Sequence, residues 1–266
     1  MTSPEAPRPN VPLGHELVGK GPVHVIVLND WLCDTSTWDA ARPFLDGTRF
    51  TYAFADLRGY GRSRGRSGAF TILEAAGDVL ALGDSLGWHR FAIVGHSMSA
   101  LVALHLAQNH AHRIERTVAL TPPPPTGFGA DEAMLSASRA LALADDATRA
   151  TFFSQRFGTR LSVGFAHYKA ARWRASADPV AAAAYVDMFA KDGLPNPRAR
   201  IPSPVLVITG EEDAPPMRSA AITSSLGPLC EAFTIEALAG CGHYPMQEMP
   251  PLTVALVERF LERRSG

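Results

Sequence analysis

The amino-acid sequence predicts an α/β protein with a mostly parallel, doubly wound sheet that one helical insertion interrupts. Short β-branched apolar runs alternate with stretches of helical spacing, which is typical of a parallel sheet covered by helices. This alternation stops at a proline-rich segment, 121–129, and resumes after a second one, 194–204. The 266 residues are 46% hydrophobic and carry a formal net charge of −1, which suits one globular unit of this size.

The individual elements follow from local patterns. Strands are predicted at 24–30, 50–57, 90–97, 116–121, 204–210 and 231–238, and those at 24–30 and 204–210 have the apolar pattern of a buried parallel strand. Helices are predicted where apolar residues recur at helical spacing, at 71–87, 99–114 and 251–264. Because strand and helix alternate up to residue 121, consecutive strands are expected to run parallel.

The segment between the two proline-rich boundaries differs from the rest of the chain. From residue 131 to about 192 it is rich in alanine, has helical character and contains no strand-like run. We therefore expect a helical cap over residues 122–199 and a core built from 13–121 and 200–266. Residues 1–12, rich in proline and polar groups, are expected to form a flexible tail.

Composition excludes several classes of function. No face or run is strongly basic, so a nucleic-acid partner is not expected. The sequence shows neither a signal-peptide pattern nor 18 consecutive apolar residues, so we expect a cytoplasmic protein without a membrane partner. Three cysteines do not suit a secreted disulfide scaffold. The expected partner is a small-molecule substrate, and a homo-oligomer is left open.

Reactive side chains follow three of the predicted strands. In an open α/β sheet, ligands bind beyond the carboxyl ends of the strands. Ser97, Asp213 and His243 each lie just past a predicted strand, in that chain order. Nucleophilic catalysis by serine needs a base that takes the hydroxyl proton and a carboxylate that orients the base. The three residues therefore predict a Ser-His-Asp arrangement.

Five motifs resemble those of the α/β-hydrolase superfamily, in the broad group of serine esterases, lactonases and C–C hydrolases. They are "VLNDWLCDTSTW" as oxyanion loop, "DLRGYGRS", "VGHSMSA" as nucleophile elbow, "VLVITGEED" as the strand bearing the acid, and "AGCGHYPMQEMP" as histidine loop. The resemblance spans roughly residues 15–121 and 200–264, with the insertion where that superfamily carries its cap. It implies the α/β-hydrolase fold and leaves the substrate open.

The resemblance also assigns roles within these motifs. Ser97 is expected to be the nucleophile of a strained strand–turn–helix elbow with small neighbours, the alternative being a serine that caps the following helix. His243 is expected to be the base, since it alone among nine histidines lies in the loop between the last strand and the last helix. The resemblance selects Asp213 rather than the neighbouring glutamates as the acid. Asp56 is interpreted as a structural loop residue.

The oxyanion hole is expected to use two backbone N–H groups, those of Met98 and Trp31, with Leu32 as an alternative to Trp31. The chain departs from its relatives here, because Asn29 and Asp30 stand where they usually carry His-Gly. An inward-pointing Asp30 carboxylate would oppose the developing negative charge, so we expect it to point away or to be hydrogen-bonded.

The sequence thus predicts a cofactor-independent serine hydrolase, acting on a small to medium, largely uncharged ester or lactone. No glycine-rich phosphate loop or C-x-x-C motif is present, so no cofactor or metal is expected, and Cys33 and Cys241 are expected to be reduced and packed. A C–C hydrolase, an acyltransferase, a cofactor-free oxygenase and a non-catalytic binding protein remain alternatives. Candidate pocket residues are Leu32, Phe128, Phe152, Tyr168 and Tyr244.

Overall fold

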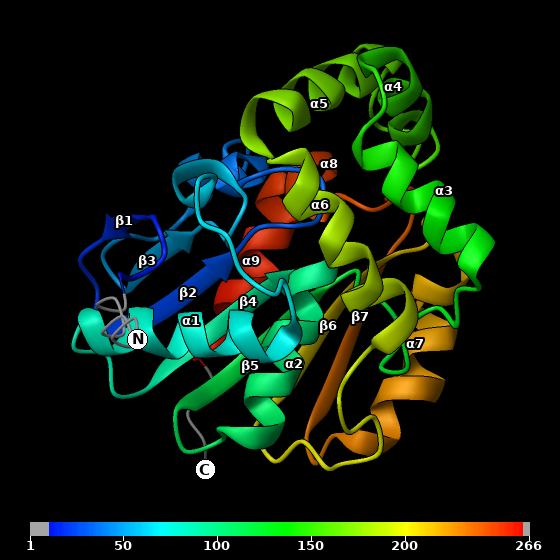
Figure 1. Cartoon of the computed structure of the whole chain (residues 1–266). Helices are drawn as coiled ribbons and strands as arrows, with labels where there is room; N and C mark the ends of the chain where they lie inside the picture. Colours follow the sequence, from blue (N-terminus) through cyan, green and yellow to red (C-terminus); the bar gives the residue numbers. More distant parts are fainter. Residues whose placement is uncertain (1–10, 263–266) are drawn as a thin grey trace, which may run out of the picture.

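The computed structural model describes residues 11–262, which contain a seven-stranded sheet (Figure 1). The strands lie in the order β1-β3-β2-β4-β5-β6-β7, and only the β1–β3 pairing is antiparallel among these described strands. This mostly parallel sheet confirms the predicted fold class. The strands are β1 (His15–Gly19), β2 (Val23–Leu28), β3 (Phe50–Ala55), β4 (Phe91–His96), β5 (Ile114–Leu120), β6 (Val205–Gly210) and β7 (Phe233–Leu238).

Helices cover both faces of the sheet, as a parallel sheet requires. Figure 1 shows α1 (Ile72–Ser85) and α2 (Met98–Asn109) in front of the strands and α9 (Pro250–Glu262) behind them. The remaining helices of the core are α7 (Ser219–Leu226) and α8 (Pro245–Glu248). Every residue of the central strands β4 and β6 is buried, which explains their continuous apolar runs.

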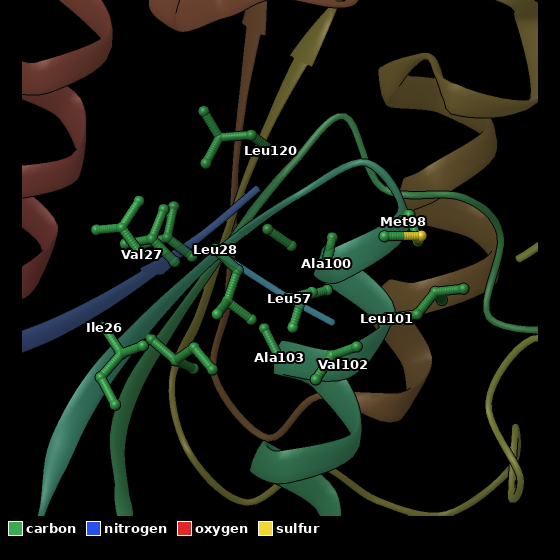
Figure 2. Close-up of a cluster of buried hydrophobic side chains, with 14 of the residues drawn as sticks. Ile26, Val27, Leu28, Leu57, Met98, Ala100, Leu101, Val102, Ala103 and Leu120 are labelled. Carbon is green, nitrogen blue, oxygen red and sulfur yellow. The ribbon is translucent and has the colours of Figure 1, made fainter. Parts of the chain in front are cut away.

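Helix α2 directly follows the central strand β4 and lies deep in the protein. Its residues Met98 to Ala107 are all buried, so this helix is apolar on every side rather than along one stripe. Figure 2 shows Ala100 and Ala103 of α2 beside Leu28, the last residue of β2, and Leu57, which follows β3. The small alanine side chains allow α2 to lie close to the sheet, and this fixes the position of its first turn.

The insertion between β5 and β6 contains α3 (Glu132–Ala142), α4 (Asp146–Ser154), α5 (Val163–Ser176) and α6 (Pro179–Val186). A π-helical turn, Asp187–Asp192, follows α6. Three of these helices begin after an aspartate whose carboxylate accepts from backbone N–H groups of the first turn; these are Asp131, Asp145 and Asp178. In Figure 1 the insertion lies beyond the end of the sheet to which β4 and β6 point.

One feature differs from the sequence-based expectation. Strand β1 was not predicted, because its five residues, "HELVG", are only partly buried and contain no apolar run. The predicted last helix, 251–264, is present up to Glu262, and its final two positions lie outside the described residues. Most of the predicted tail, residues 1–10, lies outside the described part of the chain. None of the helices in residues 11–262 is long and apolar enough to cross a membrane.

Candidate active site

Ser97 lies on the sharp turn between β4 and α2. Its backbone angles are φ 54° and ψ −120°, a strained conformation for a residue with a side chain. A Cβ atom at Gly95 would lie 2.4 Å from the carbonyl oxygen of Ser99, so the turn requires glycine two residues before the serine. The Ser97 side chain makes no capping hydrogen bond to α2, which argues against the interpretation of this serine as a helix cap.

The other serine of the turn, Ser99, has a structural role that the sequence did not suggest. Its hydroxyl accepts from the His96 N–H at 3.0 Å and donates to the His96 carbonyl at 3.1 Å. Ser99 is completely buried. It therefore fastens the end of β4 to the first turn of α2 and stabilises the conformation that presents Ser97.

His243 and Asp213 form a buried hydrogen-bonded pair beyond the ends of β7 and β6. The distance between His243 Nδ1 and Asp213 Oδ2 is 2.7 Å. Burial alone would raise the pKa of Asp213, but the charge and hydrogen bond of His243, together with the Ala214 N–H, lower it below its usual value. The carboxylate therefore stays ionised and fixes the imidazole with its Nε2 free for proton transfer.

The backbone of His243 is also held in place from three sides. Its carbonyl accepts from His96 Nε2 at 2.7 Å and from the Thr121 hydroxyl at 3.2 Å, and its N–H donates to the Arg156 carbonyl at 2.6 Å. His96 is completely buried and its ring packs against those of His243 and Tyr244, in line with the packing role expected for it. Burial lowers the pKa of His96 to about 4, although the nearby Asp30 raises it.

Glu248 organises the histidine loop, and sequence reasoning missed it. One carboxylate oxygen accepts from Gly158 N–H at 2.7 Å and from Gly242 N–H at 2.8 Å, and the other accepts from Tyr244 N–H at 3.0 Å. Glu248 thus binds the residues on both sides of His243 and ties their loop to the helical insertion. The available signal was an acidic residue five positions after His243, within an otherwise apolar motif.

The loop after β2 explains how Asn29 and Asp30 replace the usual residues. Asp30 Oδ1 accepts from the N–H groups of Leu32 at 3.2 Å and Cys33 at 2.8 Å, which confirms the expectation that this carboxylate is hydrogen-bonded. Asn29 donates to the carbonyls of Asp30 and Cys33 and accepts from Leu57 N–H. The two side chains therefore hold the loop from within.

The same contacts distinguish between the two expected donors of this loop. The Leu32 N–H is engaged by Asp30, whereas the N–H groups of Trp31 and Met98 donate to no acceptor within residues 11–262. Trp31 is further fixed by its side chain, whose Nε1–H donates to the Ala182 carbonyl of α6 at 2.7 Å. This arrangement favours Trp31 over Leu32 as an oxyanion donor.

Ser97 and His243 line one cavity of about 300 Å³ between the carboxyl end of the sheet and the insertion. This volume is at the small end of ligand pockets. Most of its wall is apolar and comes from the loop after β2, the insertion and the segment after β6. The other lining residues are Trp31, Leu32, Pro123, Phe128, Ala130, Met134, Ser138, Phe152, Arg156, Phe189, Ala190, Ala214, Pro216 and Met217.

Two of the five candidate pocket residues do not line the cavity. Leu32, Phe128 and Phe152 do, but the Tyr168 side chain is 46% exposed on the outside of α5. Tyr244 is completely buried behind His243, where its ring packs against His96 and Phe153. Helical spacing could not show which side of α5 faces the site. Although Tyr244 follows His243 in the sequence, its side chain does not face the cavity that His243 lines.

The cysteines lie in the core as free, buried thiols. Burial raises the pKa of Cys33 to about 12 and also raises that of Cys241, so neither carries an appreciable thiolate fraction at neutral pH. Asp56, completely buried, accepts from the Thr35 N–H and hydroxyl and from the Arg62 N–H, consistent with its interpretation as a loop-organising residue.

Comparison with known sequences identifies relatives of this chain. The sequence model of a family described as "Alpha/beta hydrolase family" matches residues 25–256. A pimeloyl-[acyl-carrier protein] methyl ester esterase of Salmonella heidelberg is 34% identical over 107 residues, which are 40% of this chain and 39% of that protein. The chain therefore aligns with well under half the length of this curated relative.

Solved structures resemble nearly the whole chain. An enol-lactonase from Burkholderia xenovorans is 25% identical with a TM-score of 0.78, covering 94% of this chain and 96% of that one. A bromoperoxidase from Bacillus anthracis is 19% identical with a TM-score of 0.81, covering 94% and 95%. The second likeness shows the shared fold alone.

Proposed function

Because this chain belongs to the alpha/beta hydrolase family, we propose that it is a serine hydrolase that cleaves a small to medium carboxylic ester or lactone through an acyl-enzyme on Ser97. The observation that carries the proposal is the His243–Asp213 pair, held at 2.7 Å, beside a strained Ser97 in one cavity. The esterase and lactonase names among the relatives support the same class of reaction.

In the proposed acylation step, His243 Nε2 takes the Ser97 hydroxyl proton as Ser97 Oγ attacks the substrate carbonyl carbon. The carbonyl π electrons move to oxygen, and the Trp31 and Met98 N–H groups stabilise this oxyanion. The tetrahedral intermediate then expels the alcohol oxygen, which receives the proton from His243. A linear ester loses its alcohol, while a lactone keeps it as part of the acyl group.

In the proposed deacylation step, His243 takes a proton from water as the water oxygen attacks the acyl carbon. Collapse of the second tetrahedral intermediate breaks the bond to Ser97 Oγ and returns the proton to it. The free acid is released and the protein regains its starting state. Asp213 stays ionised throughout and stabilises the His243 imidazolium, in line with its lowered pKa.

The hydrogen bonds of Asp30 argue against the alternative of a non-catalytic binding protein, in which the Asp30 carboxylate would oppose the charge of an oxyanion. Its Oδ1 is occupied by two N–H groups of its own loop. Its Oδ2 lies 3.7 Å from His96 Nδ1, on the buried side of the elbow. The carboxylate is thus held by N–H groups of its own loop through Oδ1, which favours a working oxyanion hole.

A panel of chromogenic esters and lactones tests the proposal with wild-type protein and Ser97→Ala. We expect wild-type turnover of at least one member, and a loss of about 10⁴-fold or more in kcat for Ser97→Ala. A serine-directed phosphonate should label the wild type and not the variant. Phosphonate labelling or turnover that persists in Ser97→Ala would overturn the assignment of the nucleophile, and no turnover of any activated ester would favour a binding protein.

A further inference from the structure

Arg156 stands out in the wall of the cavity. Of the described residues that line the cavity, it alone has a permanently charged side chain. Its guanidinium lies over the Phe152 ring, 4.5 Å from the ring centroid, and Phe152 is part of the same wall. A cation on an aromatic face is modestly stabilised, but this contact leaves the N–H donors at the guanidinium edge unused.

The backbone of Arg156 is fixed, while its guanidinium makes no direct polar contact within residues 11–262 and acts on the Asp213 carboxylate only from beyond ion-pair distance. The Arg156 N–H donates to the Phe153 carbonyl at 2.9 Å, and its carbonyl accepts from the His243 N–H at 2.6 Å. Within residues 11–262, the guanidinium forms neither a hydrogen bond nor an ion pair. The residue is therefore placed directly beside the histidine of the site with its hydrogen-bonding capacity unspent.

Arg149 of the same insertion shows what a structural arginine does here. Its guanidinium donates to the Ala142 carbonyl at 2.9 Å, lies 3.6 Å from an Asp146 carboxylate oxygen and covers the Trp173 ring. Arg149 thus has protein partners for its charge and for its donors. Apart from this longer-range interaction with Asp213, Arg156 has only the aromatic contact, although it lies at a half-buried and mostly apolar surface where N–H donors without an acceptor are costly.

We propose that Arg156 binds a carboxylate of the substrate, so that the substrate is a monoanionic ester or lactone. This inference rests on the proposed function, because it takes the scissile carbonyl to lie at Ser97. The guanidinium would donate to both carboxylate oxygens, a planar match that an arginine makes well. The carboxylate would supply the acceptors that the guanidinium donors lack, and the rest of the substrate would lie along the apolar wall.

The charge of the site favours a carboxylate over a phosphate monoester. A phosphate monoester carries about −1.5 to −2 charges at neutral pH, which one arginine does not balance. A carboxylate carries one negative charge and is ionised well below neutral pH. Since Arg156 is the single permanent charge among the described lining residues, a monoanion is the complementary ligand. The expectation of a largely uncharged substrate is therefore refined to an apolar substrate with one anionic end.

Matched pairs of esters test this inference. Mono-4-nitrophenyl adipate and suberate carry a terminal carboxylate, and 4-nitrophenyl hexanoate and octanoate are their neutral counterparts of equal chain length. The readout is the ratio of kcat/KM for the acidic ester to that for the neutral ester, corrected for spontaneous hydrolysis. We expect the wild type to favour the acidic ester of at least one pair by about 10- to 100-fold, as an added charge-assisted hydrogen-bonded contact predicts.

Variants separate recognition from a structural effect. In Arg156→Gln the preference should fall to within about threefold of unity, and Arg156→Lys should restore part of it because the charge returns without the planar fork. The control is Arg160→Gln, which removes an exposed arginine four residues away that lies outside the cavity lining. This control should keep the wild-type ratio.

The ester preferences of the wild type and of the Arg156 variants decide whether Arg156 binds a substrate carboxylate. A wild-type ratio near unity for both pairs, or a preference that survives in Arg156→Gln, overturns it. A variant that loses activity equally on acidic and neutral esters also overturns it, since that pattern indicates a structural role for Arg156. Failure of the proposed function is distinguishable, because the wild type would then hydrolyse neither ester of a pair, or Ser97→Ala would retain the activity.

Discussion

The carboxyl end of the sheet and the helical insertion contribute to the site in different ways. At the carboxyl end of the sheet, His243 is fixed by hydrogen bonds to Asp213, His96 and Thr121. The insertion contributes mainly apolar wall, with partly exposed side chains such as Phe152 and Phe189. On the proposed function, this difference predicts that the core carries out the chemistry and that the insertion selects the substrate.

The two regions are nevertheless joined close to the reacting atoms. Trp31 of the core donates to the Ala182 carbonyl of the insertion, and the His243 N–H donates to the Arg156 carbonyl. Glu248 of the core accepts from the Gly158 N–H of the insertion. These contacts fix the wall relative to Ser97, so substitutions in the insertion are expected to alter binding more than the catalytic step.

The largest effect is expected for a core substitution that removes the carboxylate behind the base. Asp213→Asn should lower kcat by about 10³- to 10⁴-fold, because the amide neither stabilises the imidazolium nor fixes the tautomer. Steady-state kinetics on any accepted ester, with circular dichroism to verify folding, measures this effect. A loss smaller than tenfold would show that the Asp213–His243 pair is a structural contact.

A second core prediction concerns stability at acid pH. Burial lowers the folded-state pKa of His96 to about 4, against about 6.5 in the unfolded chain. Between these values the unfolded state binds more protons, so stability must fall as the pH decreases through this range. The contribution of His96 to this loss is about 2 kcal/mol between pH 7 and pH 5.

Urea unfolding of the wild type and His96→Gln at both pH values measures this contribution. The glutamine can still donate to the His243 carbonyl but does not titrate, so the variant should lose about 2 kcal/mol less between pH 7 and pH 5 than the wild type. Equal losses in the two proteins would contradict the pKa shift of His96.

The smallest effect is expected in the insertion. Phe152→Ala should raise KM by about tenfold and leave kcat within about threefold, because it removes apolar wall and no reacting group. The matched control is Tyr168→Ala, an aromatic residue of the insertion that lies outside the cavity and should leave both constants unchanged. A fall in kcat alone for Phe152→Ala would contradict the division of roles between the two regions.

The sequence was most informative where local patterns coincide with function. The six predicted strands are all present, and the central ones among them are buried runs rich in apolar residues. Ser97, Asp213 and His243 could be selected because each follows a predicted strand. The edge strand β1 was missed, since its five residues contain no apolar run.

Contacts between distant segments could not be predicted in this way. Glu248 and Thr121 hold the His243 loop through hydrogen bonds that depend on how the loops converge. The unused N–H donors of Arg156 became apparent only when its surroundings were known. Tyr168 and Tyr244 were misplaced for the same reason, because helical spacing does not show which side of α5 faces the site, and adjacency to His243 does not fix the direction of the Tyr244 side chain.

The most direct test of the proposed mechanism is to trap the acyl-enzyme on Ser97. Wild-type protein mixed with a 4-nitrophenyl ester that it hydrolyses is quenched with acid and analysed by mass spectrometry of the intact chain and its peptides. The proposed mechanism predicts a mass increase that corresponds to one acyl group, located on the peptide that contains Ser97. The absence of any adduct during a measured burst of nitrophenol, or an adduct on another residue, would contradict it.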